Sequence, residues 1–135
     1  MRAIADTGFL VAFSNRRDRH FAWAYALAEQ VHEPLLTCEA VLAETAFHLN
    51  DSGLVLAMLD KGLVRLGFDI ESHRPELAAL AHRYADRHPD LADLCLIRMS
   101  ELYPDHPVIT VDGDFKIYRR KRRETIPLIM PPGSK

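Results

Sequence analysis

Short apolar segments alternate along the chain with longer segments that have the composition of amphipathic helices. The apolar segments, which we expect to form strands, are 2–5, 34–37, 63–68, 107–111 and 126–130. Four of the helical segments are 20–31, 39–50, 75–88 and 90–103. Two more are a first stretch that ends at residue 13 and a run that ends at residue 61. Because parallel neighbouring strands need helical crossovers, this order predicts a layered α/β fold with a mainly parallel sheet.

Several of the helix limits are marked by capping residues and prolines. Leu77 and Leu80 begin an apolar stripe at helical spacing, which predicts one amphipathic helix over 75–88. Asp90 is expected to cap the start of the next helix, and Pro104 is expected to end it.

The composition fits one compact domain over residues 1–135, because 48% of the residues are hydrophobic. A net charge of -2 excludes a globally basic nucleic-acid-binding protein, so any affinity for phosphate must be local. The N-terminus lacks the features of a signal peptide, and no apolar stretch approaches the roughly 20 residues that span a bilayer. We therefore expect a cytoplasmic protein with no membrane segment. Cys38 and Cys95 form no metal-binding or disulfide pattern and are expected to be buried reduced thiols.

Two acidic residues directly follow predicted strands. Asp6 comes after the first strand, and Asp112 comes after the strand at 107–111. Ligands of open α/β sheets gather at the carboxyl ends of the strands, so these two side chains are expected to share one cleft.

Two further acids lie on apolar faces of predicted helices. Glu44 has Val41 and Phe47 three residues away on either side, and Asp93 is followed by Ile97 one turn later. A carboxylate in such surroundings needs a partner, and a bound cation would supply one. Carboxylate ligands without histidine or cysteine favour magnesium over zinc.

Structural alternatives exist for each of these acids. Asp93, like Asp90, could simply lie at a helix N-terminus, where the helix dipole favours negative charge. Asp112 and Asp114 could form a simple turn, and Glu44 could be a buried acid paired with an arginine.

Four short motifs in a fixed order resemble the PIN-domain family, and most of all its VapC-type toxins of bacterial toxin-antitoxin pairs. The motifs are ADTGFL at 5–10, VLAE at 41–44, DLAD at 90–93 and TVDGDF at 110–115. The resemblance spans nearly the whole chain. It implies a three-layer α/β/α sandwich with a mainly parallel sheet of about five strands.

The resemblance also implies a magnesium-dependent endoribonuclease, with Mn²⁺ as the alternative ion. Its catalytic residues would be Asp6, Glu44, Asp93 and Asp112. Asp6, Asp93 and Asp112 would hold the metal, with Asp114 as a second candidate for the last ligand. The partners implied are an RNA substrate, a cognate antitoxin protein and a second copy of the chain in a homodimer.

Basic residues follow the last acidic motif and could form a track for RNA phosphates. The run comprises Lys116, Arg119, Arg120, Lys121, Arg122 and Arg123, and the loop after the first helix adds Arg16, Arg17 and Arg19. The substrate-binding candidates are Thr7, Thr110, Arg16, Lys116 and Arg119. The alternative for the basic run is a solvated surface without a specific role. The seven histidines show no metal-ligand spacing, and none is assigned to the chemistry.

Two rival functions remain open. A magnesium-dependent phosphatase also places acids beyond parallel strands, but it should contain a nucleophilic Asp and a Lys or Thr that stabilises phosphate. A binding module could keep the fold as a docking surface, with the acids retained only for folding or for metal.

Overall fold

A parallel five-stranded sheet forms the centre of the protein in a computed structural model that describes residues 1–133. The strands are β1 (Ile4–Ala5), β2 (Leu35–Thr37), β3 (Val64–Leu66), β4 (Val108–Ile109) and β7 (Leu128–Ile129). Their order across the sheet is β3-β2-β1-β4-β7, and every pair is parallel. The five predicted strand segments are therefore confirmed, each shorter than its apolar segment. The strands β1, β2 and β4 are buried throughout, as expected for a parallel sheet with helices on both faces.

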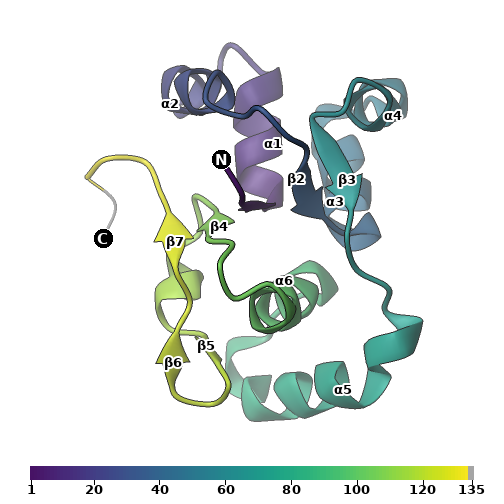
Figure 1. Ribbon diagram of the computed structural model, residues 1–135, viewed down its shortest axis with the longest axis vertical. Helices are drawn as coiled ribbons and strands as arrows, with labels where there is room; N and C mark the ends of the chain where they lie inside the picture. Colours follow the sequence, from purple (N-terminus) through teal and green to yellow (C-terminus); the bar gives the residue numbers. More distant parts are fainter. Residues whose placement is uncertain (134–135) are drawn as a thin grey trace.

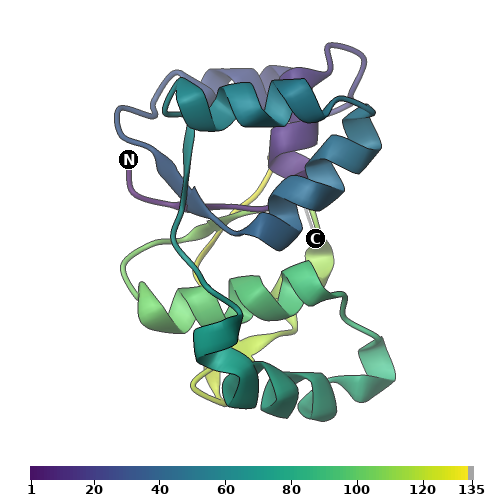
Figure 2. The ribbon, with the colours of Figure 1, turned by 90° about the vertical axis from the view of Figure 1, so that its right-hand side faces the viewer.

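Six α-helices cover the two faces of the sheet and complete a three-layer sandwich (Figures 1 and 2). One layer holds α1 (Thr7–Ser14), α2 (Phe21–Ala28), α3 (Glu39–Leu49) and α4 (Ser52–Asp60). The other holds α5 (Arg74–Arg83) and α6 (Leu91–Leu102). The predicted α/β/α architecture is thus confirmed.

Aspartates begin three of the helices, because a carboxylate oxygen can accept a hydrogen bond from a free N–H of the first turn. Asp6 accepts from Thr7 N, Asp51 accepts from Leu54 N, and Asp90 accepts from Asp93 N. The predicted cap at Asp90 is confirmed. The same bond through Asp6 directs the chain from β1 straight into α1.

The helix predicted over 75–88 is shorter than expected. After α5 ends at Arg83, a 3₁₀ turn, η2 (Ala85–Arg87), follows, and His88 adopts a left-handed conformation with φ of 50°. The break comes before Pro89, whose ring disfavours a helical conformation at the residue before it.

A second, two-stranded sheet was not predicted. The hairpin of β5 (Arg119–Arg120) and β6 (Glu124–Thr125) is antiparallel and follows a short 3₁₀ helix, η3 (Gly113–Lys116). Its turn places Lys121 and Arg122 at φ of 49° and 72°. Such positions favour Asn and Gly, so the sequence of this turn gave no hairpin signal.

Two further expectations concern the thiols and the membrane. Cys38 and Cys95 are both buried and free, as predicted. Within residues 1–133, no helix has the length and apolar character needed to cross a bilayer.

Candidate active site

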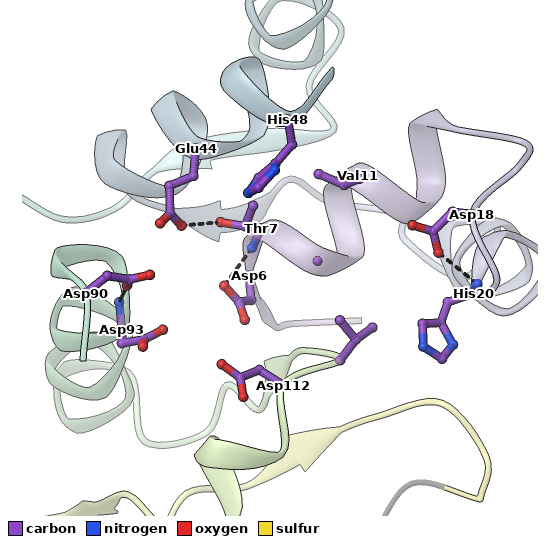
Figure 3. Close-up of a pocket in the computed structure, with 12 residues that line it drawn as sticks. Asp6, Thr7, Val11, Asp18, His20, Glu44, His48, Asp90, Asp93 and Asp112 are labelled. Atoms are coloured by element: carbon purple, nitrogen blue, oxygen red, sulfur yellow. Dashed lines mark hydrogen bonds between the residues drawn. The ribbon is translucent and has the colours of Figure 1, made fainter. Parts of the chain in front are cut away.

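A pocket of about 430 Å³ opens at the carboxyl ends of β1 and β4, where the sheet meets the starts of α1 and α6 (Figure 3). The residues that line it are Asp6, Thr7, Gly8, Val11, Asp18, His20, Glu44, His48, Asp90, Asp93, Val111 and Asp112. All four predicted catalytic acids are among them, although the chain separates the first from the last by more than a hundred positions. Parallel strands bring their carboxyl ends to one edge of the sheet, which explains the convergence.

Asp6 is the most deeply buried of these acids, with 6% of its surface exposed. One carboxylate oxygen accepts the N–H of Thr7 at 2.6 Å, and the other accepts the hydroxyl of Thr110 at 2.6 Å. Burial raises the pKa of Asp6 to about 6, and these two hydrogen bonds oppose the rise. Both oxygens of Asp6 are therefore fixed in direction.

Thr110 also links Asp6 to Asp112. The backbone N–H of Asp112 donates to the Thr110 hydroxyl oxygen at 2.9 Å, and Asp112 in turn accepts the N–H of Asp114 at 2.9 Å. Asp112 lines the pocket, whereas Asp114 is not among the lining residues. The chain after β4 thus aims one of its two aspartates at the cavity.

Glu44 reaches the pocket from the middle of α3. Its carboxylate accepts the hydroxyl of Thr7 at 2.9 Å, so this bond connects the start of α1 to the middle of α3 (Figure 3). Burial raises the pKa of Glu44, and contact with Asp90 raises it further, while Thr7 and His48 lower it. No arginine pairs with Glu44 in the part of the chain that the structure describes.

Asp93 lies in the first turn of α6, opposite Glu44. The hydroxyl of Tyr118 donates to its carboxylate at 3.4 Å. Burial is the main cause that raises the pKa of Asp93, to about 8, and the charges of Asp90, Asp6 and Asp112 add to it. The acids of the pocket therefore oppose one another's ionisation.

No arginine or lysine side chain of the described chain lines the pocket to balance its negative charge. Six lining residues carry carboxylates, namely Asp6, Asp18, Glu44, Asp90, Asp93 and Asp112, and none is Lys or Arg. Shifts of this kind, produced by burial and like charge in a cleft, are typical of functional sites.

The predicted basic track divides into parts with different environments, and none of its residues lines the pocket. One guanidinium nitrogen of Arg119 donates to the carbonyls of Lys116, Ile117 and Tyr118. Arg120 is buried and pairs with Glu124. Arg16 and Lys116 are exposed outside the cavity, as are the hairpin residues Lys121, Arg122 and Arg123.

Sequence reasoning assigned no chemistry to four of the lining residues, Asp18, His20, His48 and Asp90. His48 follows Glu44 by one helical turn, and this i, i+4 spacing could have placed both on one face of α3. Asp18 and His20 lie between α1 and α2, and no periodicity relates a loop to a distant cleft. Asp90 was assigned only its capping role, which it also performs.

The cleft wall depends on one close approach between α1 and the chain after β4. A Cβ atom added at Gly8 would lie 2.3 Å from Cγ2 of Val111. Only glycine leaves room for Val111 here, and Val111 directly precedes Asp112. The separation of Asp6 and Asp112 is therefore set partly by the absence of a side chain at Gly8.

The donor set fits a hard divalent cation that keeps much of its water. Within residues 1–133, no three Asp, Glu, His or Cys side chains lie close enough together to ligate one ion directly. Mg²⁺ is commonly held by one or two carboxylates and several waters, so a pocket of separated carboxylates suits it better than it would suit zinc. Asp6, Asp93 and Asp112 are the residues that could hold it, directly or through its water molecules.

A parallel α/β/α sandwich with converging acids at the carboxyl edge of its sheet defines the structural class. The PIN domain family model matches residues 3–121, and the chain belongs to that family. The structure is also similar to the crystal structure of VapC20 from Mycobacterium tuberculosis, described as a toxin that cleaves the sarcin-ricin loop. The TM-score is 0.73 and the identity 20%, over 85% of this chain and 93% of that chain. No curated protein matches the chain by sequence.

Proposed function

We propose that the protein is a metal-dependent endoribonuclease that acts as the toxin of a toxin-antitoxin pair. The observation that carries the proposal is the pocket that brings together Asp6, Glu44, Asp93 and Asp112 without Lys or Arg in its lining. Burial raises the pKa of three of these acids, Asp6, Glu44 and Asp93. Membership of the PIN family and the likeness to a toxin described as RNA-cleaving support it.

The chemistry proposed is hydrolysis of an RNA phosphodiester. When bound, Mg²⁺ or Mn²⁺ would supply a Lewis acid that neutralises phosphate charge and lowers the pKa of water. Asp6, Asp93 and Asp112 would hold the ion. Thr110 and the N–H of Thr7 keep both oxygens of Asp6 in place, so this acid needs little reorganisation.

Glu44 is the group best suited to accept a proton from the attacking water. Its pKa is raised, which brings a carboxylate nearer to the working pH of a general base. The Thr7 hydroxyl donates to one of its oxygens, and the carboxylate lines the pocket beside Asp90. Thr7 and Thr110 would thus act mainly on the carboxylates that they contact.

A phosphatase is less consistent with this pocket. That chemistry calls for a Lys or Thr that stabilises the transferred phosphoryl group beside a nucleophilic aspartate. In the described part of the chain no Lys lines the pocket, and the hydroxyl of Thr7, the one threonine in the lining, already donates to Glu44. A pure binding module would gain nothing from burying several acids that resist ionisation together.

Protein partners and location belong to the same proposal. A cognate antitoxin and a second copy of the chain would both need apolar contact surface. Phe47 and Leu56 supply such surface on α3 and α4, with 81% and 64% of their areas exposed. The site of action proposed is the cytoplasm, where RNA is the substrate. Light scattering of the purified chain would measure its oligomeric state.

The test is cleavage of total RNA by the purified protein with Mg²⁺, with Mn²⁺ and with EDTA. Asp6→Asn and Asp93→Asn should each lower the rate at least about 100-fold while circular dichroism shows a folded protein. Asp105→Asn, an exposed aspartate outside the pocket, serves as the matched control. Cleavage that persists in EDTA, or that both variants retain, would exclude this mechanism.

A further inference from the structure

Two histidines are the pocket's basic side chains. His20 and His48 line the cavity together with six carboxylates, Thr7 and three apolar or glycine positions. No other lining residue of the described chain can become cationic. An RNA strand that enters this cavity therefore meets only two side chains able to attract its phosphates by charge.

Hydrogen-bond donors in the pocket are equally scarce. Among the lining residues, Thr7, His20 and His48 are the only side chains that are donors in every protonation state, and the Thr7 hydroxyl already donates to Glu44. Phosphate oxygens are acceptors only, so they need N–H or O–H groups from the protein. An imidazole offers at least one N–H in either protonation state. The two histidine side chains are thus the free donors of the cavity.

His48 and His20 come from different elements and lie at separate places around the pocket (Figure 3). His48 is an exposed residue of α3, one turn beyond Glu44. His20 precedes α2, and its backbone N–H donates to Asp18 at 2.8 Å. Val11 of α1, which lies between the two histidines in the view of Figure 3, lines the same pocket as they do, so one strand bound in the pocket would pass both.

The two imidazoles differ in how firmly they are placed. The ring of His20 packs edge-on against Trp23, with centroids 6.4 Å apart, and the residue is half-buried. His48 has a similar edge-on contact with Phe47, at 5.6 Å, but both of these residues are exposed. His20 is therefore held in position, while His48 is free to adjust to a ligand.

We propose that His20 and His48 bind two phosphates of a single-stranded RNA on either side of Val11, next to the phosphate at the carboxylates. They would supply the attraction that a pocket lined by acids lacks, and they would fix the direction of the strand across it. This inference rests on the proposed function for its ligand. It assigns substrate binding to histidines in addition to any contribution from Arg16, Lys116 or Arg119.

The experiment measures RNA binding separately from cleavage. The probe is a fluorescein-labelled RNA pool of degenerate sequence, about 12 nucleotides long, titrated by anisotropy in an Asp93→Asn background with Mg²⁺. His20→Ala and His48→Ala should each raise the Kd about tenfold, because each removes one hydrogen bond to a charged group. The double variant should raise it about 100-fold.

Conservative and control variants separate binding from structure. His20→Gln and His48→Gln keep an N–H donor and should stay within about threefold of the parent. His82→Ala removes an exposed histidine that does not line the pocket and should leave the Kd unchanged. Thermal unfolding of each variant checks that the fold is intact. In otherwise wild-type protein, His48→Ala should raise KM more than it lowers kcat.

The results distinguish this inference from the proposed function. If wild-type protein cleaves RNA but the double alanine variant binds the probe normally, the histidine assignment is overturned and the nuclease stands. If wild-type protein does not cleave RNA yet binds it through the histidines, the nuclease fails and the assignment stands. No binding of the probe by the parent protein would overturn the histidine assignment, and the cleavage test would then decide the nuclease by itself.

Discussion

The acidic side chains near the two ends of helix α6 have opposite electrostatic surroundings. At its N-terminal end, Asp93 and Asp90 face Asp6 and Glu44 across a cavity without Lys or Arg. At its C-terminal end, two carboxylates are paired with arginines, with Arg98 3.1 Å from Glu101 and Arg120 2.9 Å from Glu124. The pKa of Asp93 is raised by burial and by neighbouring acids, whereas the pKa of Glu124 is lowered by Arg120.

The contrast reflects two roles of charge, one in stability and one in function. Arg120 also donates to the carbonyl of Ser100, which the end of α6 leaves free, and to the carbonyl of Pro104 just beyond the helix. Positive charge at this end also complements the helix dipole. The charges near the C-terminal end therefore stabilise the fold. Those at the N-terminal end raise one another's pKa values and resist ionisation together, which is the usual sign of a site kept for function.

The largest effect on stability should come from Arg120→Met. This change removes a buried partner of Glu124 and the bonds to the carbonyls of Ser100 and Pro104, and we expect a loss of about 3 kcal/mol in the free energy of unfolding. Urea denaturation would measure it. Arg122→Met, on the exposed turn of the same hairpin, is the matched control. An equal loss in both variants would mean that the hairpin's charge matters and the buried contacts do not.

Asp93→Asn should act in the opposite direction on the metal-free protein. A carboxyl whose pKa rises to about 8 on folding destabilises the folded state progressively as the pH increases above about 4. After allowance for solvent screening at the open side of the pocket, we expect Asp93→Asn to stabilise the protein by about 2 kcal/mol near pH 8. Near pH 4 the carboxyl is protonated in the folded state, so it no longer carries a buried charge and the gain should vanish.

Thermal unfolding in EDTA across this pH range measures the effect, with Asp105→Asn as the control. Added Mg²⁺ should reduce the difference, because it stabilises the wild-type pocket more than the variant. A variant that is less stable than wild type near pH 8 would show that Asp93 is a structural acid, like Glu101 at the other end of the helix.

Gly8→Ala tests whether the acidic end depends on shape as well as charge. The added Cβ would lie 2.3 Å from Val111 Cγ2, so Val111 or the segment that precedes Asp112 must move. We expect a loss of about 1.5 kcal/mol in stability together with slower RNA cleavage. Val111→Ala in the same chain should restore both, because it removes the clashing methyl. Failure of this rescue would mean that another contact sets the position of Asp112.

Glu124→Gln should have the smallest effect. Glu124 is exposed, and water screens its attraction to Arg120, so we expect a change within the error of a denaturation experiment. The lowered pKa gives the sign, because any contribution is present at neutral pH and is lost as the carboxylate is protonated in acid. A loss as large as that of Arg120→Met would contradict the division of roles between the carbonyls and Glu124.

Much of the fold could be predicted because its signals are local. The apolar segments gave all five strands of the main sheet, and Asp90 gave the start of α6. The hairpin could not be predicted, since Lys121 and Arg122 occupy its turn without the residues that such turns favour. Likewise, the run of basic residues looked uniform in the sequence, but folding buries Arg120 and leaves Lys121 exposed.

The amino-acid sequence by itself determined which residues have the chemistry of the site and in what order their motifs occur. Only the tertiary structure decided that the Thr110 hydroxyl holds Asp6, that Gly8 makes room for Val111, and that His20 and His48 enter the pocket. Periodicity reports which face of an element a residue occupies, so it could identify an acid on an apolar face. Which residues meet across the cleft depends on strand order and on close packing, and neither is encoded in any single segment.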